Sequence, residues 1–393
     1  MTDPVYYDPY DVEIDADPYP VFRRLREEAP LYYNEQYDFY ALSRYDDVER
    51  GLVDRETNIS GRGGILELIK AGIEMPPGIL IFEDPPTHTI HRALLSRVFT
   101  PRQVNGLEPR IRQFCVESLD RLDGVDRFDF VADLGAQMPM RVIGMLLGIP
   151  EQDQEAVRDQ ADRDLRTKPG QPQKFSGNFV DGSMFGEYID WRAEHPSDDV
   201  MTQLLQSEFE DETGATRRHT RAEILTYVSV VAGAGNETTT RLIGWCSTLL
   251  AEHPDQRRML VDDRTLVPQA IEEVLRFEPP PPVVGRYVAA DAEFQGQVVP
   301  EGSALLNLVG AANRDEDRFP DGESFDIMRN PTHLSFGFGA HFCLGAGLAR
   351  LEGRIALEEL LARFPEWDVD LDHATLQPVA MTRGWESLPL VLP

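Results

Sequence analysis

Residues 333–345 are His333-Leu334-Ser335-Phe336-Gly337-Phe338-Gly339-Ala340-His341-Phe342-Cys343-Leu344-Gly345, a glycine-rich loop that presents one cysteine. A helix-like stretch, Ala346 to Leu361, follows directly. A single cysteine is most often a small buried hydrophobe. Here the positive end of a helix lies just behind the sulfur, which favours a thiolate that accepts hydrogen bonds from backbone N–H groups. The loop therefore suits an axial metal ligand, and the metal that it suits best is haem iron.

The spacing of this loop is more specific than its cysteine. Phe336, Gly339, Cys343 and Gly345 form the pattern F-x-x-G-x-x-x-C-x-G, which resembles the haem-binding signature of the cytochrome P450 family, in its soluble bacterial form. The resemblance implies that Cys343 is the iron ligand, that Phe336 covers the proximal haem face, and that Gly339 and Gly345 let the backbone approach the sulfur.

The resemblance extends over nearly the whole chain and implies a fold as well. We expect a mainly α protein with a small mixed β-sheet, folded as a single domain over residues 1–393, with a helix-rich body and β segments near both ends. The cofactor implied is haem b, iron protoporphyrin IX. Because the chain has only three cysteines and no C-x-x-C-H motif, we expect this haem to be bound non-covalently and find no zinc cluster pattern.

Composition limits the partners. The chain has 393 residues, of which 41% are hydrophobic, and a net charge of −30. Such an acidic protein is an unsuitable partner for nucleic acid, whose binding depends on lysine and arginine. The N-terminal residues are acidic and resemble no signal peptide. The most apolar stretch, Ile224 to Leu250, is interrupted by polar residues that argue against a membrane span: Asn236, Glu237 and Arg241. We therefore expect a cytoplasmic enzyme that does not contact a membrane.

Helix signals dominate the sequence. Thr220-Arg221-Ala222-Glu223 is a capping-box pattern that begins a long apolar-periodic run to about Leu250, and His253-Pro254 then ends it. Strand signals are confined to Tyr37 to Ser43 and to Val283 to Leu308. This distribution predicts a mostly helical body with a small mixed sheet.

An acid and an alcohol lie side by side in the middle of the long helix, in Ala234-Gly235-Asn236-Glu237-Thr238-Thr239. An isolated pair of this kind is most often a solvated helix face. Together with the cysteine motif, it resembles the oxygen-binding groove of the family, where a local widening of the helix holds dioxygen and water over the iron. The resemblance implies that Ala234 and Gly235 border the haem and that Glu237 and Thr238 are catalytic residues that relay protons.

Glu273 and Arg276 are separated by two residues on a predicted helix. By itself such a pair is an ordinary salt bridge worth a few tenths of a kcal/mol. The pair resembles the E-x-x-R helix of the family, which together with a later arginine, here Arg329, fixes the loop behind the haem. The role implied is structural and not catalytic.

The two propionates of haem are carboxylates that need cationic or hydrogen-bonding partners where they are buried. His88 and Arg92 lie four residues apart, on one face of a predicted helix. The resemblance implies that these two residues bind the propionates together with Arg286 and His341. For Arg286, the alternative is an ordinary charge on a surface strand.

The substrate contacts are only outlined by the sequence. Residues 60–82 are rich in apolar side chains, which implies an apolar pocket for a small hydrophobic substrate of the lipid, terpenoid, steroid or aromatic class. Any of these side chains can instead belong to the core, the commoner fate of an apolar residue. The candidates are Ile65, Leu66, Leu68, Ile69, Ile73, Met75, Ile79, Leu80, Phe175, Phe179, Met184, Phe185, Val231, Val283, Val284 and Met381.

The reaction implied by the resemblance is insertion of one oxygen atom from O2 into a C–H bond of the substrate. The chain has no flavin-binding or iron–sulfur motif, so we expect electrons from a ferredoxin with its reductase and NAD(P)H. An acidic ferredoxin would need basic residues behind Cys343, and the arginines available are Arg97, Arg102, Arg112, Arg350 and Arg354.

Two alternatives remain open. One is a peroxide-driven peroxygenase, against which the Glu237–Thr238 pair argues, because peroxide brings its own protons and electrons. The other is a non-catalytic haem-thiolate protein that binds a gas or another ligand. A sensor of that kind normally carries an output module, and no part of this sequence suggests one.

Overall fold

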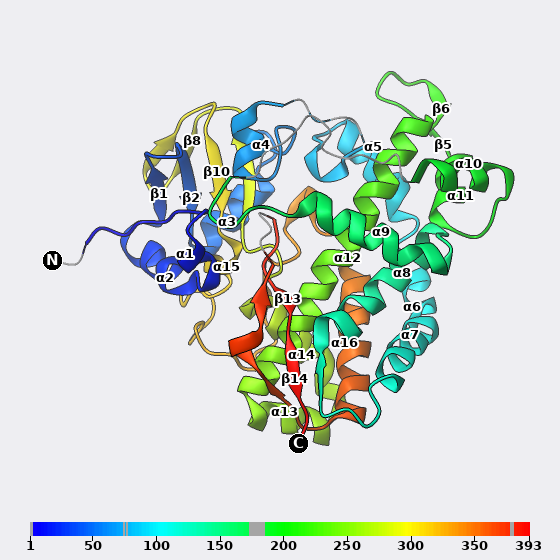
Figure 1. Ribbon diagram of the computed structural model, residues 1–393. Coiled ribbons are helices and arrows are strands. Elements are labelled where there is room, and N and C mark those ends of the chain that lie inside the picture. Colours follow the sequence, from blue (N-terminus) through cyan, green and yellow to red (C-terminus); the bar gives the residue numbers. More distant parts are fainter. Residues whose placement is uncertain (1–2, 74, 76–77, 173–184, 378–380) are drawn as a thin grey trace.

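The computed structural model of the chain describes residues 3–73, 75, 78–172, 185–377 and 381–393 (Figure 1). Helices make up most of its regular structure, and the strands form small sheets. In Figure 1 the main sheet lies to the upper left, beside a body of helices that fills the right and lower parts of the molecule. This arrangement confirms the predicted fold class.

The long helix α12 (Arg221–Glu252) runs through the helical body and is largely buried. Its capping box is formed as predicted: Thr220 Oγ1 accepts the Glu223 N–H, and the Glu223 carboxylate accepts the Thr220 N–H. The helix ends immediately before the predicted stop at His253-Pro254. It contacts α8 (Gln137–Leu147), α9 (Glu151–Leu165), α14 (Val267–Phe277) and α16 (Ala346–Arg363).

The other helices enclose this centre or cover the sheet. They are α1 (Val12–Ala16), α2 (Tyr19–Glu28), α3 (Tyr45–Val53), α4 (Leu66–Ala71), α5 (Thr87–Ser96), α6 (Pro101–Gly106), α7 (Glu108–Asp120), α10 (Gly186–Glu194), α11 (Val200–Gln206), α13 (Pro254–Asp262) and α15 (Val309–Ala312). Among the residues that the structure describes, none of these helices has both the length and the apolar character that a bilayer span requires.

The main sheet has five strands in the order β1-β2-β10-β7-β3. It is mixed, because β10 pairs parallel to β2 but antiparallel to β7. Both predicted strand regions contribute to it, and the sequence reasoning missed β1 and β3. The strands are β1 (Leu31–Asn34), β2 (Phe39–Leu42), β3 (Asn58–Ile59), β7 (Val284–Val288) and β10 (Ala304–Asn307).

The other strands form small separate sheets, and one of these pairs the C-terminal segment with β4. A three-stranded sheet of β4 (Arg127–Asp129), β11 (Asp368–Val369) and β14 (Pro389–Val391) was not predicted. The remaining strands pair two by two and are β5 (Glu208–Glu210), β6 (Thr216–Arg218), β8 (Ala292–Phe294), β9 (Gln297–Val299), β12 (Thr375–Leu376) and β13 (Trp385–Ser387).

The segment that leads into β13 packs closely on α12. A Cβ atom built on Gly384 would lie 2.5 Å from Arg241 Cδ, so the stem of this arginine occupies the space that a side chain at position 384 would need. The Arg241 guanidinium donates to the Trp385 carbonyl oxygen, and Trp385 also packs against Trp245 of α12, with ring centroids 5.2 Å apart. These contacts place residues 382–385 against the middle of α12, next to the acid–alcohol pair.

Candidate active site

The cysteine loop closes through one backbone hydrogen bond: the Cys343 N–H donates to the Phe336 carbonyl oxygen over 2.7 Å. Gly337 and Gly339 within it have φ values of 69° and 68°, a left-handed conformation that L side chains rarely adopt. A Cβ atom at Gly339 would also lie 3.5 Å from the Val53 backbone. Glycine at these two positions therefore allows the turn that exposes Cys343.

Two opposing effects act on the Cys343 sulfur, which the loop surrounds but leaves exposed on one side. Burial raises the pKa of the thiol, while the Gly345 N–H, the guanidinium groups of Arg92 and Arg350, and the Ala346 N–H lower it. The two N–H groups lie at the start of α16, so the predicted helix terminus behind the sulfur is present. This environment favours a cationic partner for the thiolate, as a ferric or ferrous ion would be.

Phe336 is buried beneath the loop, and the Arg350 guanidinium lies over its ring, 4.4 Å from the centroid. Arg350 is fixed in turn by Glu272 of α14, through hydrogen bonds of 2.7 and 2.9 Å. At Gly345, a Cβ atom would lie 4.0 Å from the Cys343 sulfur. Phe336, which precedes Cys343 in the sequence, and Gly345, which follows it, thus both belong to the structure around the candidate iron ligand.

The predicted Glu273–Arg276 pair is completely buried, with both side chains 0% exposed and an N–O distance of 2.6 Å. Arg276 also donates to the carbonyl oxygens of Asn313, Gly322 and Ser324. The later arginine, Arg329, reaches Glu273 over 3.3 Å, as predicted.

This buried pair is linked to the cysteine loop through Asn313. The Asn313 side chain accepts the Leu334 N–H over 2.9 Å and donates to the Ser335 hydroxyl over 2.8 Å, and both partners directly precede Phe336. Arg276 holds the Asn313 carbonyl oxygen, so the ion pair fixes the start of the loop that carries Cys343. Its role is structural.

Four basic side chains meet beside the loop, from α5, β7 and the loop itself. The rings of His88 and His341 stack with centroids 4.2 Å apart, and Arg92 donates to the Phe342 carbonyl oxygen over 2.6 Å. Arg286 is buried in β7 and donates to the Gly285 carbonyl oxygen over 2.9 Å. All four predicted propionate-binding residues therefore lie in one region.

This basic cluster fits two carboxylates. His88 Nε2 is buried without a hydrogen-bond partner, and Arg286 forms no ion pair within the part of the chain that the structure describes. Burial lowers the pKa of Arg286 to about 10. Burial and the neighbouring cations Arg286, His88 and Arg92 lower the pKa of His341 to about 3. His341 is therefore neutral near pH 7 and can take part in hydrogen bonds, whereas Arg286 is a buried cation that requires an anionic partner, which a propionate of a haem held by Cys343 would supply.

Glu237 and Thr238 are neighbours in α12 but have different surroundings. Thr238 is half-buried, and its hydroxyl donates to the Ala234 carbonyl oxygen over 2.8 Å. Glu237 is 4% exposed, and its carboxylate accepts from Thr382 Oγ1 over 2.8 Å and from Arg241 over 3.4 Å. The local widening of the helix that the sequence predicts is not observed, because residues 221–252 form one uninterrupted α-helix.

Arg241 and Thr382 were missed by the sequence reasoning as partners of Glu237. Arg241 carried a recognisable signal, because it lies four residues after the acid on the same helix. Thr382 carried none, because its contact with Glu237 joins positions 145 residues apart. Ser60 was also missed and likewise carried no local signal, because its hydroxyl lies 3.1 Å from Nε2 of the distant residue His341.

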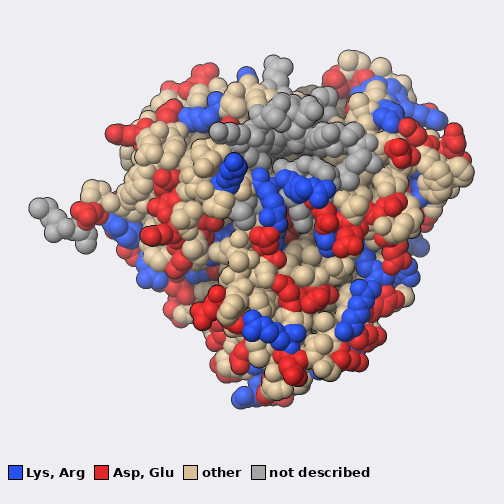
Figure 2. Space-filling model, viewed as in Figure 1, with Lys and Arg blue, Asp and Glu red and all other residues tan. Residues whose placement is uncertain are grey.

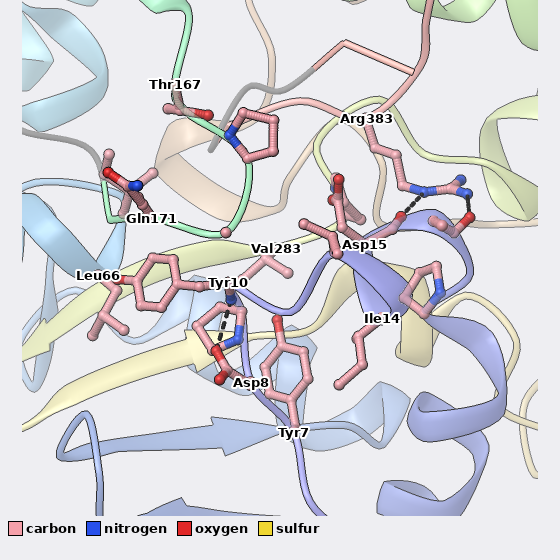
Figure 3. A pocket seen from close by; sticks show the side chains of 18 of the residues that line it. Tyr7, Asp8, Tyr10, Ile14, Asp15, Leu66, Thr167, Gln171, Val283 and Arg383 are labelled. Atoms are coloured by element: carbon pink, nitrogen blue, oxygen red, sulfur yellow. Dashed lines mark hydrogen bonds between the residues drawn. The ribbon is translucent and has the colours of Figure 1, made fainter. Parts of the chain in front are cut away.

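A cavity of about 280 Å³ lies where the N-terminal segment meets the main sheet and α4 (Figure 3). It brings together three of the predicted substrate-contact residues, Ile65, Leu66 and Val283, with the rings of Tyr7 and Tyr10. Thr382 and Arg383 also line it, and Arg383 is tied to the Asp15 and Ala16 carbonyl oxygens. Thr382 therefore both lines this cavity and donates a hydrogen bond to Glu237 of α12.

Other predicted substrate contacts are core residues. Leu68, Ile69, Ile79, Leu80 and Phe185 are all buried among other apolar side chains. These five residues therefore fit the alternative given above, that an apolar residue of this segment belongs to the hydrophobic core. Phe175, Phe179 and Met184 lie outside the described residues.

Three of the arginines expected to attract an acidic partner are occupied by glutamates. Arg350 pairs with Glu272, and Arg112 and Arg354 form one network with Glu108, Glu358 and Glu359. The network contains two cations and three anions, so the expectation of a basic patch at these residues is wrong. The sequence reasoning overlooked two local signals, because Glu108 and Arg112, and Arg354 and Glu358, lie four residues apart on one helix. The contacts between α7 and α16 required the fold. Figure 2 shows acidic and basic side chains interspersed over the face in view.

Comparisons with known proteins agree with this geometry. The family model described as Cytochrome P450 matches residues 186–379. The "Putative cytochrome P450 123" of Mycobacterium tuberculosis is 35% identical over 390 residues, which cover 98% of this chain and 96% of that protein. The structure of CYP109Q5 from Chondromyces apiculatus has a TM-score of 0.85 at 35% identity and covers 98% of each chain.

A further structure, CYP109E1 from Bacillus megaterium in complex with testosterone, also has a TM-score of 0.85, at 29% identity, and covers 97% of this chain and 99% of that one. The similarity extends over nearly the full length in each case, and it includes the loop around Cys343 and the buried pair behind it. This chain belongs to the cytochrome P450 family, and it is accordingly a monooxygenase of the haem-thiolate type.

Proposed function

We propose that this cytochrome P450 inserts one oxygen atom from O2 into a C–H bond of a small hydrophobic substrate, with electrons supplied by a ferredoxin and its reductase from NAD(P)H. The observation that carries the proposal is the site beside α5 and α16, where an exposed cysteine lies next to the buried groups of His88 and Arg286, which have no carboxylate partner among the residues that the structure describes. Haem supplies the oxygen and redox chemistry when it is bound there.

In this proposal the residues have separate roles. Cys343 ligates the iron, with Phe336, Gly339 and Gly345 shaping the loop around it, and Ala234 and Gly235 bordering the haem on α12. His88, Arg92, Arg286 and His341 bind the propionates of a non-covalent haem b. Thr238 and Glu237 move protons from the protein toward the oxygen site. We also propose that residues 1–393 act as one domain in the cytoplasm.

The substrate class is supported by the apolar part of the cavity in Figure 3, where aliphatic side chains lie beside two tyrosine rings, although charged side chains such as Asp15 and Arg383 also line it. Such a surface binds apolar ligands by removing their surface from water, worth roughly 25 cal/mol per Å². The testosterone complex of a related P450 supports a ligand of steroid-like size and polarity. We therefore place steroids and terpenoids first among the hydrophobic classes, before fatty acids and aromatic acids.

A ferredoxin is proposed as the electron donor because the 393 residues have three cysteines, too few for a cluster held by four cysteine thiolates. Two candidate arginines, Arg97 and Arg102, are exposed and form no ion pair within the described part of the chain. Docking should therefore depend on these two residues more than on Arg112, whose charge is neutralised locally.

The test compares two conditions on a panel of steroids and terpenoids that shift the haem spectrum. NADH with ferredoxin and ferredoxin reductase should give a hydroxylated product, and hydrogen peroxide alone should give little. Product formed equally well from peroxide would favour the peroxygenase alternative. Ligand binding without product under either condition would favour the non-catalytic alternative. Arg97→Glu should raise the KM for ferredoxin, with Arg112→Glu as the matched control.

A further inference from the structure

The cavity in Figure 3 carries charged groups that a hydrocarbon substrate would leave without partners. Its lining includes three carboxylates, Asp8, Asp15 and Glu67, and two cations, Lys168 and Arg383. Covering a carboxylate with an apolar ligand removes water from it, which costs free energy unless the ligand supplies a charge or a hydrogen bond. The charged part of the lining therefore bears on the substrate class.

Asp15 lies on α1, where the cavity opens to solvent. Within the described part of the chain its carboxylate makes no hydrogen bond and no ion pair, although Arg383 acts on it from farther away. Partial burial raises the pKa of Asp15 in spite of that positive charge. The ionised carboxylate is thus incompletely compensated, and a cation that enters the cavity would stabilise it.

The Tyr7 side chain is an independent second feature of the cavity, because it is only 4% exposed. Its hydroxyl has no hydrogen-bond partner among the residues that the structure describes. Figure 3 shows this hydroxyl pointing upward into the space between Tyr10 and Asp15. The Tyr7 N–H donates to Tyr32 Oη over 3.3 Å, and the Tyr7 carbonyl oxygen accepts from Asn34 Nδ2 over 2.9 Å. The hydroxyl is therefore held in place and available to a ligand.

The electrostatics at the Tyr7 hydroxyl favour a cationic ligand. Burial and the negative charges of Asp15, Asp8 and Glu67 raise the pKa of Tyr7, so all three carboxylates act on this one buried group. A phenol oxygen accepts a hydrogen bond from an ammonium N–H, and a tyrosine ring attracts a cation over its face. A protonated amine meets both conditions.

The two cations of the lining do not reverse this preference. The Arg383 guanidinium donates to the Glu278 carboxylate over 2.6 Å and to the Asp15 and Ala16 carbonyl oxygens over 2.9 and 2.6 Å. Its donors are therefore used within the protein. Lys168 is exposed, and solvent and salt screen its charge.

We propose that this cavity binds the protonated amine of a hydrophobic substrate, with Asp15 as its counter-ion and the Tyr7 hydroxyl as a hydrogen-bond acceptor. The inference rests on the proposed function and narrows its substrate class to steroids and terpenoids that carry a basic nitrogen. Thr382 lines the cavity and also donates to Glu237, so a ligand anchored at Asp15 would extend toward the middle of α12.

The first experiment measures binding to the haem-loaded protein by isothermal titration calorimetry and does not depend on turnover. Three androstanes differ in one group, which is trimethylammonio, tert-butyl or carboxylate. The trimethylammonio compound should bind about fivefold more tightly than its neutral tert-butyl isostere, as the upper range for a partly exposed ion pair implies, and the carboxylate should bind most weakly. Equal binding of the cationic and neutral compounds, tighter binding of the carboxylate, or no binding of the cationic compound would overturn the proposal.

The two acids of α1 provide a matched pair of variants. Asp15→Asn should remove most of the preference for the trimethylammonio compound, because it removes the counter-ion and keeps the shape of the side chain. Glu13→Gln should leave the preference unchanged, because Glu13 lies on the same helix and does not line the cavity. Equal effects of the two substitutions would show that only the general surface charge attracts the cation, and Asp15 would not be its counter-ion.

Tyr7 is tested with a dimethylammonio androstane, which has the N–H group that the trimethylammonio compound lacks. This titration uses the reduced carbon monoxide complex, so that the amine cannot ligate the iron. Wild-type protein should bind the dimethylammonio compound about threefold more tightly than the trimethylammonio compound, as one hydrogen bond implies. Tyr7→Phe should abolish this difference, and an unchanged difference would exclude the hydroxyl as the acceptor.

These outcomes are distinct from failure of the proposed function. If the tert-butyl androstane is hydroxylated with ferredoxin and the cationic compound binds no better, the proposed reaction stands and the amine site is wrong. If the cationic compound binds with the expected dependence on Asp15 but no androstane is hydroxylated, the amine site stands and the proposed reaction is wrong.

Discussion

Replacing Arg276 by methionine should destabilise the protein far more than the same replacement at Arg350. The two arginines pair with adjacent residues of α14, Glu273 and Glu272. The first pair is 0% exposed on both sides, whereas the second is 38% and 21% exposed. Since the residue types are the same, the two variants differ in the burial of the pair and in the backbone hydrogen bonds that only Arg276 makes.

The magnitude follows from the hydrogen bonds that are lost. Arg276 donates to both Glu273 oxygens and to three backbone carbonyl oxygens. Removing one partner of a buried ion pair costs about 3–5 kcal/mol. Because Glu273 keeps the Asp326 N–H and the Arg329 guanidinium, we expect a loss near the lower end, about 3 kcal/mol. The exposed Arg350 pair should contribute at most about 1 kcal/mol.

Urea unfolding of the haem-loaded proteins, followed by far-ultraviolet circular dichroism, measures both losses if the slopes with denaturant agree. A second readout is the rate of haem transfer to excess apomyoglobin, which Arg276→Met should increase because Asn313 no longer fixes the start of the cysteine loop. Equal losses of stability for the two variants would refute the assignment of Arg276 as the lock of that loop.

Three further outcomes are expected. Cys343→His should abolish the carbon monoxide band to which the family owes its name, measured on the reduced protein, and a variant that keeps the band would disprove thiolate ligation by Cys343. Thr238→Ala should keep haem and substrate binding but divert NADH into hydrogen peroxide, whereas Glu237→Gln should slow turnover itself by about 10²–10⁴-fold; unchanged product per NADH in the alanine variant would contradict the relay. His219 is buried, and burial lowers its pKa to about 4, so between pH 4 and the ordinary value of 6.5 the unfolded state binds the extra proton and stability rises with pH. His219→Gln should flatten this rise in urea titrations at several pH values, and an unchanged slope would show that His219 does not cause it.

The sequence predicted the elements whose signals are local. The capping box at Thr220, the stop at Pro254 and the two strand regions depend on residues that are near each other in the chain, and all are present in the structure. The spacing of Glu273 and Arg276 likewise gave their ion pair, because three residues bring side chains together on a helix.

The errors concern contacts between distant segments. Part of the charge compensation at Arg112 and Arg354 comes from glutamates that only the packing of α7 against α16 brings near. The rest comes from glutamates four residues away on the same helix, which the sequence reasoning overlooked. The partner of Glu237 at Thr382 depends on where residues 382–385 cross α12. Apolar residues such as Leu68 and Ile79 have the same composition signal whether they line a pocket or fill the core, so their positions required the structure.

The close packing of Gly384 on Arg241 has a consequence for the mutational history and the engineering of this enzyme. A methyl group at position 384 would collide with the arginine stem, where the separation would be only 2.5 Å. A larger residue at 384 is therefore tolerated only after position 241 has changed to a shorter one, and the order of the two substitutions is constrained. Libraries that vary the residues near Thr382 one position at a time would miss such combinations, whereas joint randomisation of 241 and 384 would recover them.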